Sequence, residues 1–307
     1  MEAIFSRACR LLRLKRQDGR RDTLYPAGPD TAVLVDAPSD GEDLDLTPCR
    51  HTAAPGFQIM SDLHLEKGMR YNDFVIPPRA PYLVLAGDIG CFRHKTEYLS
   101  FLCRQCEAFE HVFLVPGNHE FYHISRAEGL AVAGRLHSQI PHGRVTLMDK
   151  QRVDLDEHDT VLLGCTLHSH IPDDYTALTN DFQMIEGWRV ADHNREHQED
   201  LAWLEQELAL IHATRPQSRV IVITHYAPVF DGASHSKHQD SPLRSCFCSD
   251  ALRVLVERRP AAMRQVSHWV FGHTHYNARF RTARVELASN TPNDEACRRK
   301  FDIVATI

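Results

Sequence analysis

The stretch HVFLVPGNHEFYH, residues 111–123, begins as a strand and ends in a group of polar side chains. Its first five residues form a β-branched and aromatic run of the kind found inside a sheet, and a Pro-Gly pair then ends the run. Asn118, His119 and Glu120 come immediately after that pair. Asn and His are also ordinary loop residues, so this stretch alone does not separate a loop from a functional site. The residues at the ends of the other strands decide between the two.

Apolar runs of strand length recur from about residue 55 onward, and helical segments separate several of them. The clearest helix is 194–213, where Leu201, Leu204 and Leu208 recur at helical spacing and Asn194 is the expected N-cap. Strands that alternate with helices predict an α/β fold. The runs expected to form strands are FQIM, YLVLAG, HVFLVPG, TVLLGCTL, RVIVITH and HWVFGH.

The first 55 residues lack this regularity. A basic stretch, RACRLLRLKRQDGRR, is followed by an acidic one, DTAVLVDAPSDGEDLDLT, and several Pro, Gly and Asp residues interrupt both regions. We therefore expect residues 1–55 to form a poorly ordered extension and residues 56–307 to form one domain. The basic start is weakly similar to a mitochondrial transit peptide, but Glu2 and the shortage of Ser favour a cytosolic tail.

The composition limits the classes of partner. With 307 residues, 43% hydrophobic and 25% charged, the chain is typical of one large α/β domain with extensions. A net charge of −6 gives no electrostatic footprint for nucleic acid. Because no apolar run approaches the roughly 18 residues of a membrane span and the N-terminus lacks a secretory signal, we expect a cytoplasmic protein.

The nine cysteines are scattered rather than arranged as a compact disulfide framework, so reduced thiols are expected. Cys103 and Cys106 form a C-x-x-C, but they lie in a helical pattern and have no second pair at zinc-finger spacing. We assign them no chemistry.

Side chains of metal-ligand type follow five of the expected strands, at the point where each strand ends. In open α/β sheets the ligand crevice lies outside the carboxyl ends of the strands, so these side chains should converge there. Asp-x-His and His-x-His would place two ligands on one side of an extended segment, because side-chain direction repeats every two residues. Gly87, Gly117 and Gly272 permit tight turns beside them. The side chains are Asp62 and His64, Asp88, Asn118 and His119, His225, and His273 and His275, in strand order.

Taken in order, Asp-x-His, Gly-Asp, Gly-Asn-His-Glu, a later His after a strand and Gly-His-x-His resemble the calcineurin-like metallophosphoesterase superfamily over about residues 57–290. The resemblance implies an α/β/β/α sandwich with a central double β-sheet. It also implies that residues 56–307 are a metallophosphoesterase domain, which hydrolyses phosphoester bonds with two metal ions.

By this resemblance, Asp88 bridges the two ions. A carboxylate with two oxygens can span cations roughly 3.5–4 Å apart, the separation typical of two-metal phosphoesterase sites. Mixed nitrogen and oxygen ligands without thiolate suit Mn, Fe or Zn. One ion would be held by Asp62, His64, Asp88 and His275, and the other by Asp88, Asn118, His225 and His273.

The same resemblance leaves His119 on the substrate side of the third strand's end. Two cations lower the pKa of a bridging water, so hydroxide can attack phosphorus in line while a general acid protonates the leaving group. His119, with an ordinary pKa near 6.5, is the candidate acid. Glu120 is interpreted either as a support for the ligands or as an exposed loop carboxylate.

One motif differs from that of the protein phosphatases, and this difference limits the class of substrate. Members of the superfamily that act on phosphoproteins carry Gly-Asp-x-x-Asp-Arg-Gly, but this chain reads GDIGCFR, with Arg93 one residue too late. We therefore expect a small or nucleotide-like phosphomonoester or phosphodiester. A Ser/Thr protein phosphatase, a catalytically silent scaffold and a metal-dependent redox enzyme on the same fold are the alternatives.

Two loops and the end of the chain bear on the substrate pocket. The insert 229–249 lies between two ligand-bearing strands and should shape specificity, and LHSH comes after another strand. Related members often end in Ser-Asn-Gln-x-Gly-Tyr, whereas this chain reads ASNTPNDEAC. The Gly-Tyr turn is missing, so the resemblance does not identify the residues that form the wall of the substrate pocket. The side chains that are either phosphate contacts or solvated loop residues are His235, His238, Arg244, His168 and His170.

Overall fold

The computed structural model describes residues 56–140, 143–238, 240–292 and 306–307. The expected N-terminal extension, residues 1–55, lies outside the described residues, so the proposed domain boundary stays a prediction. None of the described helices is long and apolar enough to cross a lipid bilayer.

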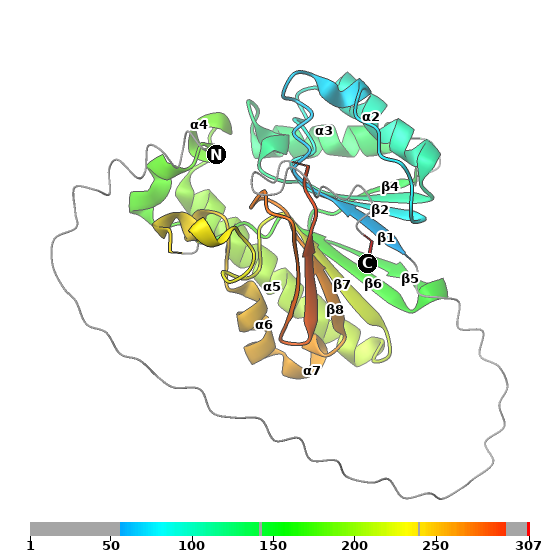
Figure 1. The fold of residues 1–307 in the computed structure, drawn as a ribbon, viewed down its shortest axis with the longest axis vertical. Helices are drawn as coiled ribbons and strands as arrows, with labels where there is room; N and C mark the ends of the chain where they lie inside the picture. Colours follow the sequence, from blue (N-terminus) through cyan, green and yellow to red (C-terminus); the bar gives the residue numbers. More distant parts are fainter. Residues whose placement is uncertain (1–55, 141–142, 239, 293–305) are drawn as a thin grey trace, which may run out of the picture. The chain divides into compact units, whose positions relative to one another are not determined.

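In this part of the chain ten strands form two sheets, and all six apolar runs identified in the sequence become strands (Figure 1). The first sheet is entirely parallel, in the order β1-β2-β3-β4. Its strands are β1 (Phe57–Met60), β2 (Tyr82–Ala86), β3 (His111–Val115) and β4 (Val145–Leu147).

The second sheet has the order β5-β6-β7-β8-β10-β9. Its four central strands are parallel, and the strands at both edges are antiparallel to their neighbours. Its strands are β5 (Gln151–Leu155), β6 (Thr160–Cys165), β7 (Arg219–Thr224), β8 (Val266–Val270), β9 (Ala278–Thr282) and β10 (Val285–Ser289).

The two sheets pack face to face, and helices cover their outer faces, as the predicted α/β/β/α sandwich requires (Figure 1). A buried cluster drawn from both sheets, including Phe113, Val115, Ile221 and Ile223, fills the space between them. Because both faces of each sheet are covered, the interior strands β2, β3, β6 and β7 are almost continuously apolar rather than alternating. The α-helices are α2 (Lys95–Ala108), α3 (Arg126–Gln139), α4 (Asp181–Met184), α5 (Val190–Thr214), α6 (Ala251–Arg258) and α7 (Pro260–Met263).

Short 3-10 helices occupy several of the connections. They are η1 (Arg70–Asn72), η2 (His119–Phe121), η4 (Asp156–His158), η5 (Asp173–Leu178), η6 (Ser236–His238) and η7 (Pro242–Cys246).

Helix α5 begins at Val190, before the predicted start, and Asn194 is not its N-cap. Arg189 takes the cap position, where its main-chain N–H donates to the Asp192 carboxylate (3.2 Å). Asn194 instead lies in the second turn, where its side chain donates to the carbonyl of Ile171 (2.9 Å) and accepts from the N–H of Ile171 (2.8 Å). The expected capping residue therefore fastens a loop to the helix.

The two cysteines of α2 are free thiols, as expected from the sequence. Cys106 lies on the buried face of the helix, and Cys103 is partly exposed.

Candidate metal centre

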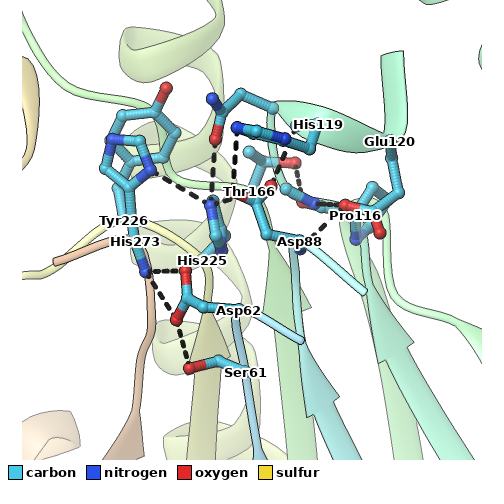
Figure 2. A network of polar contacts seen from close by, with 12 residues as sticks. Ser61, Asp62, Asp88, Pro116, His119, Glu120, Thr166, His225, Tyr226 and His273 are labelled. Atoms are coloured by element: carbon cyan, nitrogen blue, oxygen red, sulfur yellow. Dashed lines mark hydrogen bonds and ion pairs between the residues drawn. The ribbon is translucent and has the colours of Figure 1, made fainter. Parts of the chain in front are cut away.

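The side chains predicted from the strand ends meet at one place, beyond the C-terminal ends of β1, β2, β3, β7 and β8. Figure 2 shows Asp62, Asp88, His225 and His273 turned toward one another from separate strands. Ligating atoms of Asp62, His64, Asp88 and His275 lie within 4.8 Å of one another, and those of Asp88, His225 and His273 form a second such group. Asp88 belongs to both groups. The remaining predicted ligand, Asn118, joins the second group, because its Oδ1 lies 3.1 Å from Nε2 of His225.

The backbone beside these ligands is left-handed, so the extended geometry expected for Asp-x-His and His-x-His was wrong. Among non-glycine residues a positive φ is uncommon and is retained where the surrounding structure fixes it. Main-chain bonds do so here: the N–H of Asp62 donates to Gly87, and the N–H of His64 donates to Asp88 (both 2.9 Å). The ligands with positive φ are Asp62 (54°), His64 (47°), Asp88 (55°), His273 (66°) and His275 (49°).

Two of the glycines predicted to permit turns serve different purposes. Gly87 has φ of 86°, and a Cβ there would lie 2.3 Å from Nδ1 of His225. Gly117 has no positive φ, but its Cβ would lie 2.3 Å from Oδ1 of Asp88. At Gly117 the absence of a side chain therefore permits close approach to the site rather than a special backbone turn.

The second ligand group contains facing lone pairs. His225 donates its Nδ1–H to the carbonyl of Ala86 (2.9 Å), and His273 donates its Nε2–H to the carbonyl of Cys246 (3.3 Å). The remaining ring nitrogens, His225 Nε2 and His273 Nδ1, lie 3.2 Å apart. Oxygens of Asn118 (3.1 Å) and Asp88 (3.3 Å) face the same His225 nitrogen. Acceptor atoms that converge without a hydrogen between them fit a bound cation.

The charge of Asp88 favours a positive charge at the same place. Burial disfavours a charged His225 ring, but Asp88 beside it outweighs burial and raises the pKa of His225 to about 9. Burial likewise opposes ionisation of Asp88, but His225 and His119 outweigh it and hold the pKa of Asp88 well below its usual range. The carboxylate shared by the two groups is therefore ionised, as a bridging ligand must be.

The first ligand group has a similar arrangement. His64 donates its Nδ1–H to Glu66 Oε1 (3.1 Å), so its Nε2 carries the lone pair. That nitrogen lies 2.9 Å from Nε2 of His275, which is 3.5 Å from Oδ1 of Asp62. Asp62 is itself fixed, because it accepts the main-chain N–H of His273 (2.9 Å). Imidazole and carboxylate ligands without thiolate in both groups fit a transition-metal cation such as Mn, Fe or Zn.

His119 stands apart from the buried ligands. Its side chain is 19% exposed, and its Nε2 lies 3.9 Å from Oδ2 of Asp88. Its Nδ1 lies 2.9 Å from Oε1 of Glu66, and its ring stacks on Tyr122 with centroids 4.1 Å apart. Burial opposes protonation of His119, but Asp88 and Glu66 outweigh burial and raise the pKa of its ring. His119 therefore combines access from outside with a tendency to hold a proton, as a general acid requires.

Glu66 is a residue of the site that was not identified from the sequence. Its Oε1 accepts hydrogen bonds from both His64 and His119, and it forms a third cluster with these two residues. Burial raises the pKa of Glu66, but the hydrogen bonds from His119 and His64 outweigh burial and lower it to about 2. The signal was present, because Glu66 continues the alternation of Asp62 and His64 by one more step.

Glu120 is fully buried, so its interpretation as an exposed loop carboxylate was wrong. One oxygen accepts the main-chain N–H groups of Gly117 (2.6 Å) and Asp88 (2.9 Å). The other accepts the N–H of Ile89 and the hydroxyl of Tyr98 (both 2.9 Å). Burial, and then the negative charge of Asp88, raise the pKa of Glu120 to about 7. This carboxylate joins the turns after β2 and β3, which carry Asp88 and Asn118.

The insert 229–249 contacts the ligands through Cys246 and Phe247. Arg244 is held by Asp231 (2.9 Å) and lies over the ring of Phe230. The contacts with the ligands come instead from the end of the insert, where the carbonyl of Cys246 accepts from His273 and the ring of Phe247 lies 5.1 Å from that imidazole. Five side chains were left by the sequence as either phosphate contacts or solvated loop residues, and within the described part of the chain none of them belongs to a ligand cluster. They are His235, His238, Arg244, His168 and His170.

The two histidines of LHSH differ in burial. His170 is exposed, whereas His168 is 4% exposed and packs against Tyr226 and His193. Of the terminal stretch, Asn290 donates to the carbonyl of Ile59 (2.9 Å), and the residues from 293 to 305 lie outside the described part of the chain.

Comparison with known proteins agrees with this geometry. The family model for calcineurin-like phosphoesterases matches residues 57–277. An uncharacterized protein of Acanthamoeba polyphaga mimivirus, L509, is 25% identical over 266 residues, which cover 76% of this chain and 89% of that protein.

Among solved structures, the phosphopantetheinyl hydrolase of Mycobacterium tuberculosis has a TM-score of 0.60 and 16% identity, covering 83% of this chain and 96% of that one. This similarity is one of fold. A dimetal phosphatase from Danio rerio has a TM-score of 0.42 and 16% identity, covering 76% and 87% of the two chains. Since the family match covers most of the chain and includes every predicted ligand from Asp62 to His275, this protein belongs to the calcineurin-like phosphoesterase family.

Proposed function

We propose that this protein hydrolyses a small or nucleotide-like phosphoester, either a monoester or a diester, with two metal ions that share Asp88. The observation that carries the proposal is the pair of ligand groups that meet at this one buried carboxylate. Facing ring nitrogens in each group, 2.9 Å apart between His64 and His275 and 3.2 Å apart between His225 and His273, support a cation at each place.

Two cations held here would supply hydroxide from water near neutral pH and would offset the charge of the phosphate. The chain's own contribution to the departure of the alcohol is His119. Its Nδ1–H is directed at Glu66, so its Nε2 is the nitrogen free to deliver a proton to the leaving oxygen. Glu66 keeps the ring in that orientation and favours its protonated form.

The substrate class rests on the surroundings of Arg93. Arg93 is exposed, and within the described residues no hydrogen bond or ion pair joins it to the ligand groups. Gly-Asp-x-x-Asp-Arg-Gly places its arginine one residue earlier than Arg93, so this chain lacks the arginine of that phosphate clamp at its usual position. This favours a small or nucleotide-like phosphoester over a phosphoprotein.

A substrate panel tests the proposal. Purified protein supplied with Mn²⁺ should hydrolyse bis(p-nitrophenyl) phosphate or p-nitrophenyl phosphate and should be a poor catalyst toward phosphopeptides. The Asp88→Asn variant, prepared in the same way, is the control for contaminating phosphatases and should be inactive. Selective and efficient turnover of phosphopeptides would contradict the proposed substrate class. Equal activity of the Asp88→Asn variant would contradict the proposed site.

A further inference from the structure

Asp181 lies at the first residue of α4, in the segment between β6 and α5 that carries none of the ligand motifs identified in the sequence. Its side chain is buried, with 3% exposure, and accepts hydrogen bonds from three other side chains. Oδ1 accepts from Asn118 Nδ2 (2.8 Å) and from the Tyr122 hydroxyl (2.9 Å), and Oδ2 accepts from the Tyr226 hydroxyl (3.1 Å). Each of these three partners touches the candidate metal centre.

The bond to Asn118 decides which end of that amide faces the metal ligands. A carboxylate accepts hydrogen bonds and donates none, so only the amide nitrogen of Asn118 can face Asp181. The amide oxygen then points the other way, toward Nε2 of His225 at 3.1 Å. If the amide were reversed, the Nδ2 hydrogens of Asn118 would instead point at the lone pairs of His225 and His273.

The two tyrosines extend this support to two histidines. The ring of Tyr122 stacks on His119 with centroids 4.1 Å apart, and the centroid of the Tyr226 ring lies 4.0 Å from that of His273. The hydroxyls of both tyrosines end on Asp181. The carboxylate of Asp181 therefore restrains Asn118 directly. It restrains His119 through the ring of Tyr122, and His273 through the ring of Tyr226.

We infer that Asp181 is a positioning residue, which aims the oxygen of Asn118 at the second metal position and holds the rings beside His119 and His273. The inference rests on the proposed two-metal function. It assigns Asp181 to the second metal position, because Asn118 and His273 both belong to that group of ligands.

A reciprocal exchange of the two side chains tests this. In Asp181→Asn the new amide accepts from Asn118 in only one of its two orientations and donates in the other, so it no longer fixes the aim of the Asn118 oxygen. In the double variant Asp181→Asn/Asn118→Asp, the carboxylate at position 118 presents an oxygen to the metal in either orientation, and the amide at position 181 can donate to its other oxygen. Asp200→Asn is the matched control, because Asp200 is also a fully buried carboxylate but bonds to Leu167 (2.8 Å) and Lys150 (3.4 Å).

The readout is titration of the metal-free proteins with Mn²⁺, followed by equilibrium dialysis and metal analysis. Wild-type protein and Asp200→Asn should bind two ions. Asp181→Asn should bind the first ion as wild type does and the second about 10–100-fold more weakly, the usual loss when a partner that orients a ligand is removed. The exchanged pair should recover most of that affinity.

The inference is overturned if Asp181→Asn binds both ions with wild-type affinity, or if both ions weaken equally and the exchange restores neither. If Asp181→Asn folds poorly, the exchanged pair is compared with Asn118→Asp alone, which sets two carboxylates against each other at positions 118 and 181. An exchanged pair that binds the second ion no better than Asn118→Asp also overturns the inference. Wild-type protein that binds one ion would instead overturn the proposed function, and the inference with it.

Discussion

Oε1 of Glu66 lies 2.9 Å from Nδ1 of His119 and 3.1 Å from Nδ1 of His64, so one carboxylate oxygen joins the candidate acid to a candidate metal ligand. The Nε2 atoms of the two imidazoles face different groups. His64 Nε2 faces His275, and His119 Nε2 is on the accessible side of Asp88. Substitutions at His119 and Glu66 should therefore have different effects on metal binding.

His119→Ala should separate chemistry from metal binding. Turnover of an alkyl phosphoester, a poor leaving group, should fall by roughly 10²–10⁴, the usual range for the loss of a general acid, while metal content stays at the wild-type level. A nitrophenyl ester hardly needs protonation, so its rate should fall much less. Equal losses for both esters with metal retained would show that His119 positions the phosphate instead. Loss of metal would place it among the ligands.

Glu66→Gln should lower both activity and metal affinity. Its amide retains the shape of the carboxylate, and its oxygen can still accept from both rings, but it loses the charge that favours protonated His119 and strengthens both hydrogen bonds. We expect a loss of about 10–100-fold in the affinity for one metal ion. A double-mutant cycle with His119→Ala should be non-additive for turnover of the alkyl ester, because Glu66 acts on proton transfer through His119. Additive losses would contradict this connection.

Glu120→Gln should destabilise the fold without direct involvement in chemistry. The carboxylate accepts main-chain N–H groups on both oxygens, so an amide must turn its own hydrogens toward at least one of these donors. Burying an unsatisfied donor costs about 1–3 kcal/mol, and this should appear in urea unfolding of the metal-free protein. Tyr98→Phe removes only one donor to Glu120 and should cost about 1 kcal/mol. A Glu120→Gln variant as stable as wild type would contradict this role.

Buried neutral histidine should make the fold sensitive to acid. Burial, and then the neighbouring His168, hold the pKa of His193 well below its ordinary value of 6.5. The unfolded chain therefore takes up a proton near pH 6.5 that the folded protein excludes, so stability is fully present above this pH and falls as the pH drops below it. The loss is about 1.4 kcal/mol per pH unit for one such group.

The His193→Gln variant isolates this contribution. Urea unfolding of both metal-free proteins should be compared between pH 5 and pH 8. Their stability difference should be constant above pH 7 and should shift in favour of His193→Gln below pH 6.5. Parallel profiles over the whole range would show that the folded protein does not exclude a proton from His193.

The strand ends could be predicted from the sequence because each ligand comes after a continuous apolar run. Central parallel strands covered on both faces have this appearance, and all six runs became strands. The edge strands β5 and β9 did not stand out, because they mix exposed and partly buried residues and contain Arg or Asp. β4 was missed because it is only three residues long.

The residues and backbone geometry that hold the ligands in place were harder to predict from the sequence. Asp181 bonds to Asn118 and Tyr122, which lie 63 and 59 residues away in the chain, so no local pattern connects them. The left-handed backbone at Asp62 and His64 was also hidden, since the alternating spacing of these residues is equally that of an extended segment. Both features depend on long-range bonds that form only when distant parts of the chain come together.

The metal content of the purified protein tests the central claim most directly. Metal-free protein should be dialysed against increasing Mn²⁺, and the ratio of bound ion to chain should be measured by elemental analysis, with Asp88→Asn alongside. The two ligand groups that share Asp88 lead us to expect saturation at about two ions per chain and a clear loss in the variant. Saturation of the wild-type protein at one ion that supports full activity would contradict the two-metal account.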